Sequence, residues 1–170
     1  MTGRWAGVAA IGWSALYVAS KVHLALEERL GVTGGPHVPP ERYAAYGPGE
    51  VARAQWANAA VGLLVIAVAA TALLTLRHRA ARWTVLTALG TCTLVAAVGA
   101  AGMLGGALLT DRGGAPFGAY CAIWTALLAL TTTDLHRRTR ASAVRCAESS
   151  PATRSGRGFL VGQDAGEPLQ

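Results

Sequence analysis

Three ionisable side chains that could act together lie near the end of the first apolar stretch of the sequence: Lys21, His23 and Glu27. On an α-helix, His23 and Glu27 would lie one turn apart on the same face, where an imidazole and a carboxylate can share a proton. A lysine within an apolar segment is energetically costly, which makes Lys21 a candidate functional residue. If the protein is an enzyme, we expect His23 or Glu27 to donate or accept a proton and Lys21 to stabilise negative charge. If the helix leaves the membrane near Leu24, the same side chains are merely interfacial.

Four other side chains are candidates for a substrate pocket around Lys21. Tyr17 lies one turn before Lys21 on the same helical stripe, and Trp13 lies on the neighbouring stripe. Gln55 and Asn58 lie near the start of the second apolar stretch. Amides inside membrane helices hydrogen-bond to neighbouring helices, so we expect both to approach the Lys21 region from the facing helix. In the alternative interpretation, the two amides only hold helices together.

The sequence predicts neither a bound metal nor a cofactor. A metal site on His23 and Glu27 would need a further ligand, and His37 is the nearest other histidine in the sequence. The cysteines form no C-x-x-C pair, and the chain lacks the nucleophile, phosphate-loop and dinucleotide-binding motifs. Any small-molecule ligand therefore stays unidentified at the level of the sequence.

The elements that must position these residues are four apolar stretches in a chain of 170 residues, which cover about residues 5–26, 51–76, 83–109 and 117–133. Only 14% of the residues are charged, against about 25% in soluble domains. A helix needs about 20 apolar residues to cross a bilayer. We therefore predict an all-α integral membrane four-helix bundle over residues 1–135, with the lipid bilayer as its main partner.

The charges between these stretches predict the orientation in the membrane. Residues 77–82 and 136–140 are short and strongly basic, whereas residues 27–50 carry four glutamates against two arginines. Because short basic segments stay in the cytoplasm, we predict that both termini are cytoplasmic. Alternatively, Ser20 ends a signal-peptide cleavage site, which would leave three spans in the same orientation.

The sequence changes composition at residue 136. Residues 136–170 are rich in Ser, Thr, Gly, Pro and Arg and carry no apolar stripe, so we predict a disordered cytoplasmic tail. Its arginines contribute to the net charge of +6 and should attract anionic lipid headgroups. Nucleic-acid binding is not expected, because no aromatic residues alternate with the basic ones.

Two glycine-containing segments carry further expectations. The loop of residues 27–50 is longer than packing needs and contains Gly34-Gly35 and Pro39-Pro40, so we expect it to cap an outer polar pocket. Gly102 and Gly106 are spaced for close helix packing. We expect that packing to lie within the bundle, with association of two copies as the alternative.

Residues 6–13 and 15–17, Lys21 and residues 31–36 together resemble the opening of small four-span bacterial membrane proteins of the DUF3995 family. The sequence departs from that family at His23, where the family more often has an aromatic residue. The resemblance implies a bacterial plasma-membrane protein and brings no activity with it. Three classes of function remain: a non-enzymatic membrane protein, a membrane enzyme that uses His23 and Glu27, and a small transporter or transporter subunit.

Overall fold

The structure is a computed structural model that describes residues 3–74, 76, 78–110 and 114–149. Within those ranges it is entirely helical, with no strand, which confirms the predicted all-α class. The helices are α1 (Gly3–Leu26), the short 3-10 helix η1 (Pro40–Ala45), α2 (Glu50–Leu73), α3 (Arg79–Leu109) and α4 (Ala115–Ser149).

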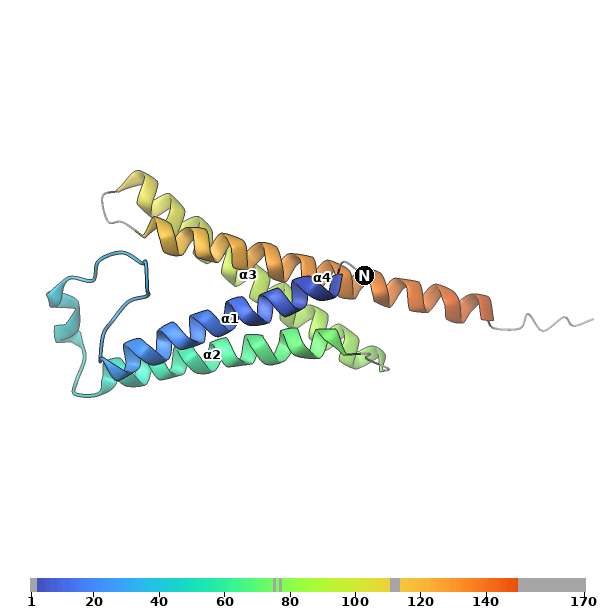
Figure 1. The fold of residues 1–170 in the computed structure, drawn as a ribbon, viewed down its shortest axis with the longest axis horizontal. Helices are drawn as coiled ribbons and strands as arrows, with labels where there is room; N and C mark the ends of the chain where they lie inside the picture. The colour runs from blue at the N-terminus through green and yellow to red at the C-terminus, as the bar shows by residue number, and fades with distance from the viewer. Residues whose placement is uncertain (1–2, 75, 77, 111–113, 150–170) are drawn as a thin grey trace, which may run out of the picture.

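The four long helices form two hairpins that lie against each other (Figure 1). α1 packs closely on α2, α3 packs closely on α4, and the main contact between the hairpins is that of α1 with α4. The loop of residues 27–49, the end of α3 and the start of α4 lie at one end of the molecule, which we call the loop end (Figure 1). The start of α1, the start of α3 and the second half of α4 lie at the opposite end, which we call the basic end.

Small side chains allow α1 and α2 to approach closely. Ala10, Ser14, Ala59 and Ala69 are buried almost completely along the two helices. A Cβ atom added at Gly62 would lie 2.7 Å from Val18 Cγ2, so this contact requires a glycine. Small residues at helix contacts are typical of membrane bundles, in which helices associate through close packing.

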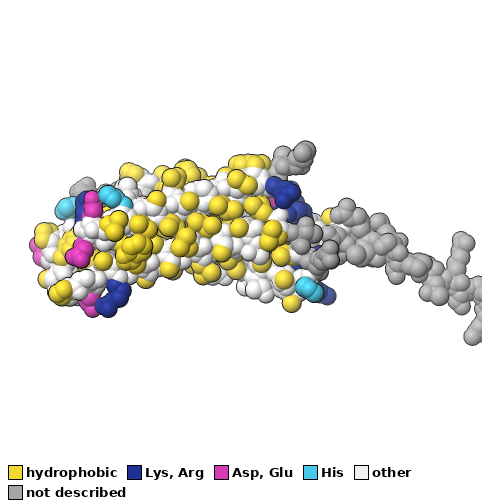
Figure 2. Space-filling model, turned by 60° about the horizontal axis from the view of Figure 1, so that its bottom comes forward, with side chains coloured by type: hydrophobic (Ala, Val, Ile, Leu, Met, Phe, Trp, Pro, Cys, Tyr) yellow, Lys and Arg dark blue, Asp and Glu magenta, His cyan; other side chains and the backbone are white. Residues whose placement is uncertain are grey.

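The outer surface of the bundle is apolar between two polar ends. Figure 2 shows hydrophobic side chains over the middle of the molecule and charged ones at either end. Val8, Leu64 and Val95 are more than 60% exposed on α1, α2 and α3. All four long helices are long and apolar enough to cross a membrane, and such an exposed apolar surface is unfavourable in water.

α4 continues well beyond the predicted end of the fourth span. The structure has helix through Ser149, so residues 136–149, predicted as part of a disordered tail, are helical. Leu135 is buried, and Arg138 Nη2 lies 2.7 Å from Asp134 Oδ2 and 3.2 Å from the Ala72 carbonyl oxygen. The contact with Ala72 holds α4 against α2, and the pair with Asp134 stabilises the helix itself, where no apolar stripe predicted it. Residues 150–170 of the predicted tail lie outside the described residues.

The expected packing of Gly102 and Gly106 within the bundle is wrong. A Cβ atom at either position would meet no described atom within 4 Å. The close glycine contact on α4 involves Gly118 instead, where an added Cβ would lie 2.8 Å from Leu104 Cγ. Association of two copies through Gly102 and Gly106 stays a prediction.

Candidate functional site

Lys21 is a buried cation at the loop end. Its side chain is on α1 and the residue is 3% exposed. The Lys21 ammonium donates hydrogen bonds to the Gly31 carbonyl oxygen at 2.8 Å and to Gln55 Oε1 at 2.9 Å. Gln55 Nε2 donates in turn to the carbonyl oxygen of Arg29 at 2.7 Å. These groups join α1, α2 and the loop, and we call them the Lys21 latch.

The end of α1 positions the two carbonyl groups of the latch. The Arg29 N–H bonds back to the Leu24 carbonyl oxygen at 2.9 Å, and Glu28 has a φ of +51°. This is the usual geometry with which a helix ends, except that glycine normally occupies the left-handed position. Gly31 follows with a φ of +104°, which side chains rarely adopt. The chain thus reverses sharply and brings the Arg29 and Gly31 carbonyl groups within reach of Gln55.

The structure brings His23 and Glu27 together but separates them from the Lys21 latch. His23 Nε2 lies 3.4 Å from Glu27 Oε1, and the two side chains are 66% and 39% exposed. Glu27 Oε2 also lies 3.3 Å from Arg29 Nη1. Lys21 and Leu24 occupy the inner stripe of α1, so His23 is turned outward. The three candidate catalytic residues therefore form two groups.

His23 borders a cavity between the end of α1 and the loop. The cavity has a volume of about 470 Å³, and its polar lining includes His23, Arg29, His37 and Tyr43. The Tyr43 hydroxyl accepts a hydrogen bond from the Leu30 N–H at 3.1 Å, which ties η1 to the end of α1. Among the described residues, no three metal-ligating side chains gather in one place. The cavity can therefore offer hydrogen bonds and positive charge to a small ligand.

Trp13 and Tyr17 lie in an aromatic cluster between α1 and α4. The Trp13 ring stacks on that of Tyr120 with 4.9 Å between centroids, and Trp13 Nε1 donates to the Tyr120 carbonyl oxygen at 3.2 Å. The Tyr120 hydroxyl donates to the Trp13 carbonyl oxygen. Tyr17 packs on Trp124, and the Lys21 Nζ atom lies 5.6 Å from the centre of the Tyr17 ring. The two residues thus connect the latch to α4.

Tyr17 also lines a second cavity at the loop end. It measures about 320 Å³ and lies between α1, the loop and the start of α4, where Phe117 and Tyr120 contribute its aromatic wall. Trp13 lines neither this cavity nor the one beside His23, so the two predicted pocket aromatics, Trp13 and Tyr17, do not meet in either of them. The lining is mostly apolar, in contrast to the cavity beside His23.

Asn58 does not face Lys21 as expected. Its side chain is exposed, whereas Gln55 and Ala59 are buried. At this level α2 packs mainly on α1, and the second hairpin diverges from it (Figure 1). Because α2 has one close neighbour at this level, it buries only a narrow stripe of side chains against α1. Ala59 lies on that stripe and Asn58 does not.

The loop also contacts the second hairpin. The Gly34 carbonyl oxygen accepts a hydrogen bond from the Phe117 N–H at 3.1 Å, in the first turn of α4. Ser20 Oγ and Thr33 Oγ1 lie 2.7 Å apart and hold the same part of the loop on α1. The loop therefore bridges both hairpins, as a cap over this end would.

Sequence reasoning missed the acceptors of the latch and one interhelical bond. The carbonyl groups of Arg29 and Gly31 belong to the backbone, so no side-chain pattern reveals them. The one available signal in the sequence was Gly31, because glycine permits the backbone conformation of a sharp turn. Ser14 is fully buried and accepts a hydrogen bond from Trp124 Nε1 at 3.0 Å. A serine among alanines in a membrane helix is a weak sign of such a contact.

Comparison with known proteins assigns no family and no function to this chain. The sequence matches no family model, and no curated protein or solved structure is detectably similar to it. The resemblance to the DUF3995 family therefore stays a prediction based on the first helix and the loop. Function must be inferred from the residues themselves.

Proposed function

We propose that this chain is a non-enzymatic, four-span protein of the bacterial plasma membrane that presents a rigid polar cap at the outer surface for binding. The observation that carries the proposal is the Lys21 latch. A catalytic ammonium must face its substrate, but that of Lys21 is buried and bound to Gly31 and Gln55. Buried polar groups that are hydrogen-bonded to one another make a structure rigid. The latch therefore supports a role in holding the loop, with the cavity beside His23 as the binding surface.

Membrane embedding and orientation are parts of the same proposal. The exposed apolar belt between two charged ends is what a bilayer would cover (Figure 2). Most arginines with described side chains lie at the basic end, which also holds the start of α1, the end of α2 and the start of α3. By the positive-inside rule, the basic end and both termini are cytoplasmic and the loop end is outside.

Thiol labelling in spheroplasts tests this orientation. In a variant whose three cysteines are replaced, His37→Cys places a thiol at the loop end and Arg140→Cys places one at the basic end. We expect a membrane-impermeant maleimide to label the His37→Cys protein directly and the Arg140→Cys protein only after permeabilisation. The opposite pattern would contradict the orientation, and release of the protein by alkaline carbonate would contradict embedding.

An acid–base enzyme is the second candidate, because the His23–Glu27 pair is formed and His23 borders the polar cavity. The two proposals differ in what Glu27→Gln does. The gene is first deleted, and the metabolite and lipid profiles of the deletion strain are compared with those of the parent strain. The Glu27→Gln protein is then expressed from a plasmid in the deletion strain. The binding role predicts that this variant restores the parental profile. The enzyme role predicts that it fails at unchanged protein level.

Glu50→Gln is the matched control for that experiment. Glu50 is also a loop-end carboxylate paired with an arginine, since its Oε1 atom lies 2.9 Å from Arg53 Nη2. Neither glutamate lines the cavity beside His23, but Glu27 contacts His23 and Arg29, which do. Failure of Glu27→Gln alone would favour the enzyme, whereas restoration by both variants would favour the non-enzymatic role.

A further inference from the structure

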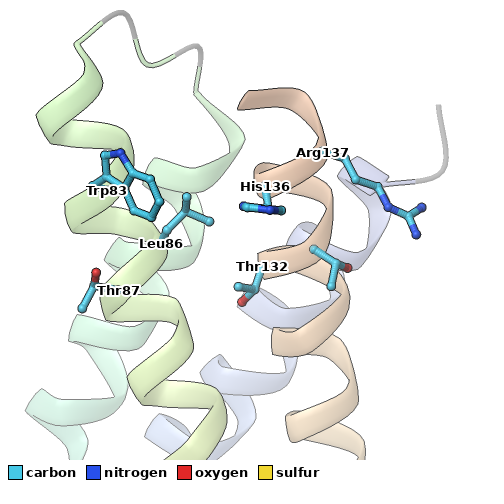
Figure 3. A pocket seen from close by; sticks show the side chains of 7 residues that line it. Trp83, Leu86, Thr87, Thr132, His136 and Arg137 are labelled. Carbon is cyan, nitrogen blue, oxygen red and sulfur yellow. The ribbon is translucent and has the colours of Figure 1, made fainter. Parts of the chain in front are cut away.

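The basic end contains two adjoining cavities between α3 and α4. One measures about 410 Å³ and the other about 470 Å³, and both are lined by Trp83, Leu86 and His136. Figure 3 shows Trp83 and Leu86 on α3 facing His136 and Thr132 on α4. Cavities of this size hold small ligands or headgroups. None of the residues singled out from the sequence as a site lies here.

Three arginines line the second cavity: Arg79 and Arg82 on α3 and Arg140 on α4. Arg82 Nε donates to the Leu76 carbonyl oxygen at 2.7 Å, which fixes its guanidinium group at this end. Arg79 and Arg140 make no ion pair or hydrogen bond with any residue that the structure describes. Several guanidinium groups around one cavity are suited to bind phosphate oxygens.

The side chains that the structure describes at this end supply little negative charge to neutralise these arginines. Asp134, the one carboxylate with a described side chain at this end, is paired with Arg138, at 2.7 Å. At the loop end, by contrast, Arg29 and Arg53 each lie within 3.3 Å of a glutamate oxygen. Among the described residues, Arg79 and Arg140 therefore have no anionic partner, and the cavity between them can accept an anion.

The shape of the cavities indicates which anion. Their polar side is formed by the arginines and His136, while Leu86 and the Trp83 ring give an apolar floor. Trp83 is 55% exposed, and tryptophan side chains commonly lie at the level of lipid headgroups. The exposed apolar surface of α3 continues from there towards Leu94 and Val95. An anionic head and an apolar tail can thus be accommodated side by side.

We propose that the ends of α3 and α4 form a binding site for the phosphate headgroup of an acidic phospholipid, held by Arg79, Arg82 and Arg140. His136 and Trp83 form the wall of the site, and the acyl chains lie along α3. Basic pockets between helices at the cytoplasmic side of membrane proteins bind such headgroups. This inference rests on the membrane embedding proposed above and is independent of the loop-end site.

Native mass spectrometry of the full-length protein tests the proposal. Protein released from micelles that contain equal amounts of phosphatidylglycerol and phosphatidylcholine should retain phosphatidylglycerol preferentially. Arg140→Gln should weaken this binding about fivefold, the equivalent of about 1 kcal/mol for one arginine. The variant removes no contact with a described residue, so it should fold normally, and circular dichroism verifies that it does.

Arg4→Gln is the matched control. It removes the same charge from the first turn of α1, at the same end of the molecule (Figure 1), but Arg4 lines neither cavity. We expect its lipid binding to stay within twofold of the unmodified protein. Equal losses for Arg4→Gln and Arg140→Gln would mean diffuse attraction to anionic lipid and would overturn a discrete site, as would equal retention of the two lipids.

Inorganic phosphate forms the third arm of the experiment. If the site is built for a lipid, millimolar phosphate should displace phosphatidylglycerol poorly, because it lacks the apolar contacts. Displacement at concentrations comparable to the lipid would assign the cavity to a free phosphate compound and overturn the lipid proposal. Since membrane extraction and the labelling pattern do not require a bound lipid, failure here is distinguishable from failure of the proposed function.

Discussion

At the loop end, Lys21, Arg29 and Arg53 each bind an acceptor that the chain itself supplies, whereas at the basic end Arg79 and Arg140 bind none among the described residues. Backbone carbonyl groups and glutamates satisfy the first set of cations. The second set lies exposed around cavities. The comparison teaches that Lys21, Arg29 and Arg53 help to hold the fold, whereas Arg79 and Arg140 are available to an external anion.

The largest expected effect comes from removing the Lys21 ammonium. Lys21→Met should lower the free energy of unfolding by about 3 kcal/mol, because the Gln55 amide oxygen and the Gly31 carbonyl lose a charged donor while staying buried. Unfolding by sodium dodecyl sulfate in mixed micelles, followed by circular dichroism, measures the loss.

Arg140→Gln sharpens the comparison in the same assay. It removes one positive charge at the basic end, where no described group depends on it. In lipid-free detergent the free energy of unfolding should change by less than about 0.5 kcal/mol. If the two variants were equally destabilised, the contrast between the ends would be wrong.

Pushing α1 and α2 apart should lower the free energy of unfolding, but by less than the loss of the Lys21 ammonium does. Gly62→Ala places a methyl group 2.7 Å from Val18 Cγ2 and 3.0 Å from Tyr17 Cδ1. Such overpacking should lower the free energy of unfolding by about 2 kcal/mol. It should also loosen the Lys21 latch, which lies one turn beyond Tyr17. Thermal denaturation in detergent would detect the loss of stability. Gly102→Ala is the control, since its new methyl group meets no described atom within 4 Å. Destabilisation by Gly102→Ala would instead show that a second copy packs there.

The hydrogen bond between Ser14 on α1 and Trp124 on α4 should contribute less to the free energy of unfolding than the Lys21 latch does. Ser14→Ala removes the acceptor of the Trp124 indole N–H and should cost about 1 kcal/mol, the usual range for a hydrogen bond between membrane helices. Thr71→Ala removes a hydroxyl that donates to the Ala67 carbonyl oxygen of its own helix, so its effect should be smaller. Equal thermal shifts for the two variants would contradict an interhelical role for Ser14.

The smallest effect is a gain in stability at the end of α1. Glu28 has a positive φ, which costs a side-chain-bearing residue about 1 kcal/mol. Glu28→Gly should recover part of that cost and raise the melting temperature slightly. Glu27→Gly, one residue earlier and without a positive φ, should lower it because the pairs with His23 and Arg29 are lost.

Much of the helical framework could be predicted from apolar length alone. The first three helices begin or end within a few residues of the predicted stretches, because turn-forming or basic residues interrupt them. The end of α4 could not be predicted in this way. Beyond residue 133 the helix is stabilised by single contacts, such as the Arg138–Asp134 pair, which leave no periodic apolar signal.

The site could be predicted in part. Lys21 and Gln55 lie at similar depth on neighbouring helices, and each needs a polar partner, so their meeting follows from the sequence. The outward position of His23 and Asn58 depends on which helices diverge at the loop end, and this is a property of the tertiary structure. No side-chain pattern encodes the backbone carbonyl groups that complete the latch.

The hydrogen bond from the Phe117 N–H to the Gly34 carbonyl oxygen has a consequence for biogenesis. A chain is synthesised from its N-terminus, and early segments generally fold first. The acceptor at Gly34 and the neighbouring Pro36, which an added Cβ at Gly114 would approach to 3.0 Å, therefore exist before α4 leaves the ribosome. The finished first hairpin thus provides a template on which the later one docks during translation.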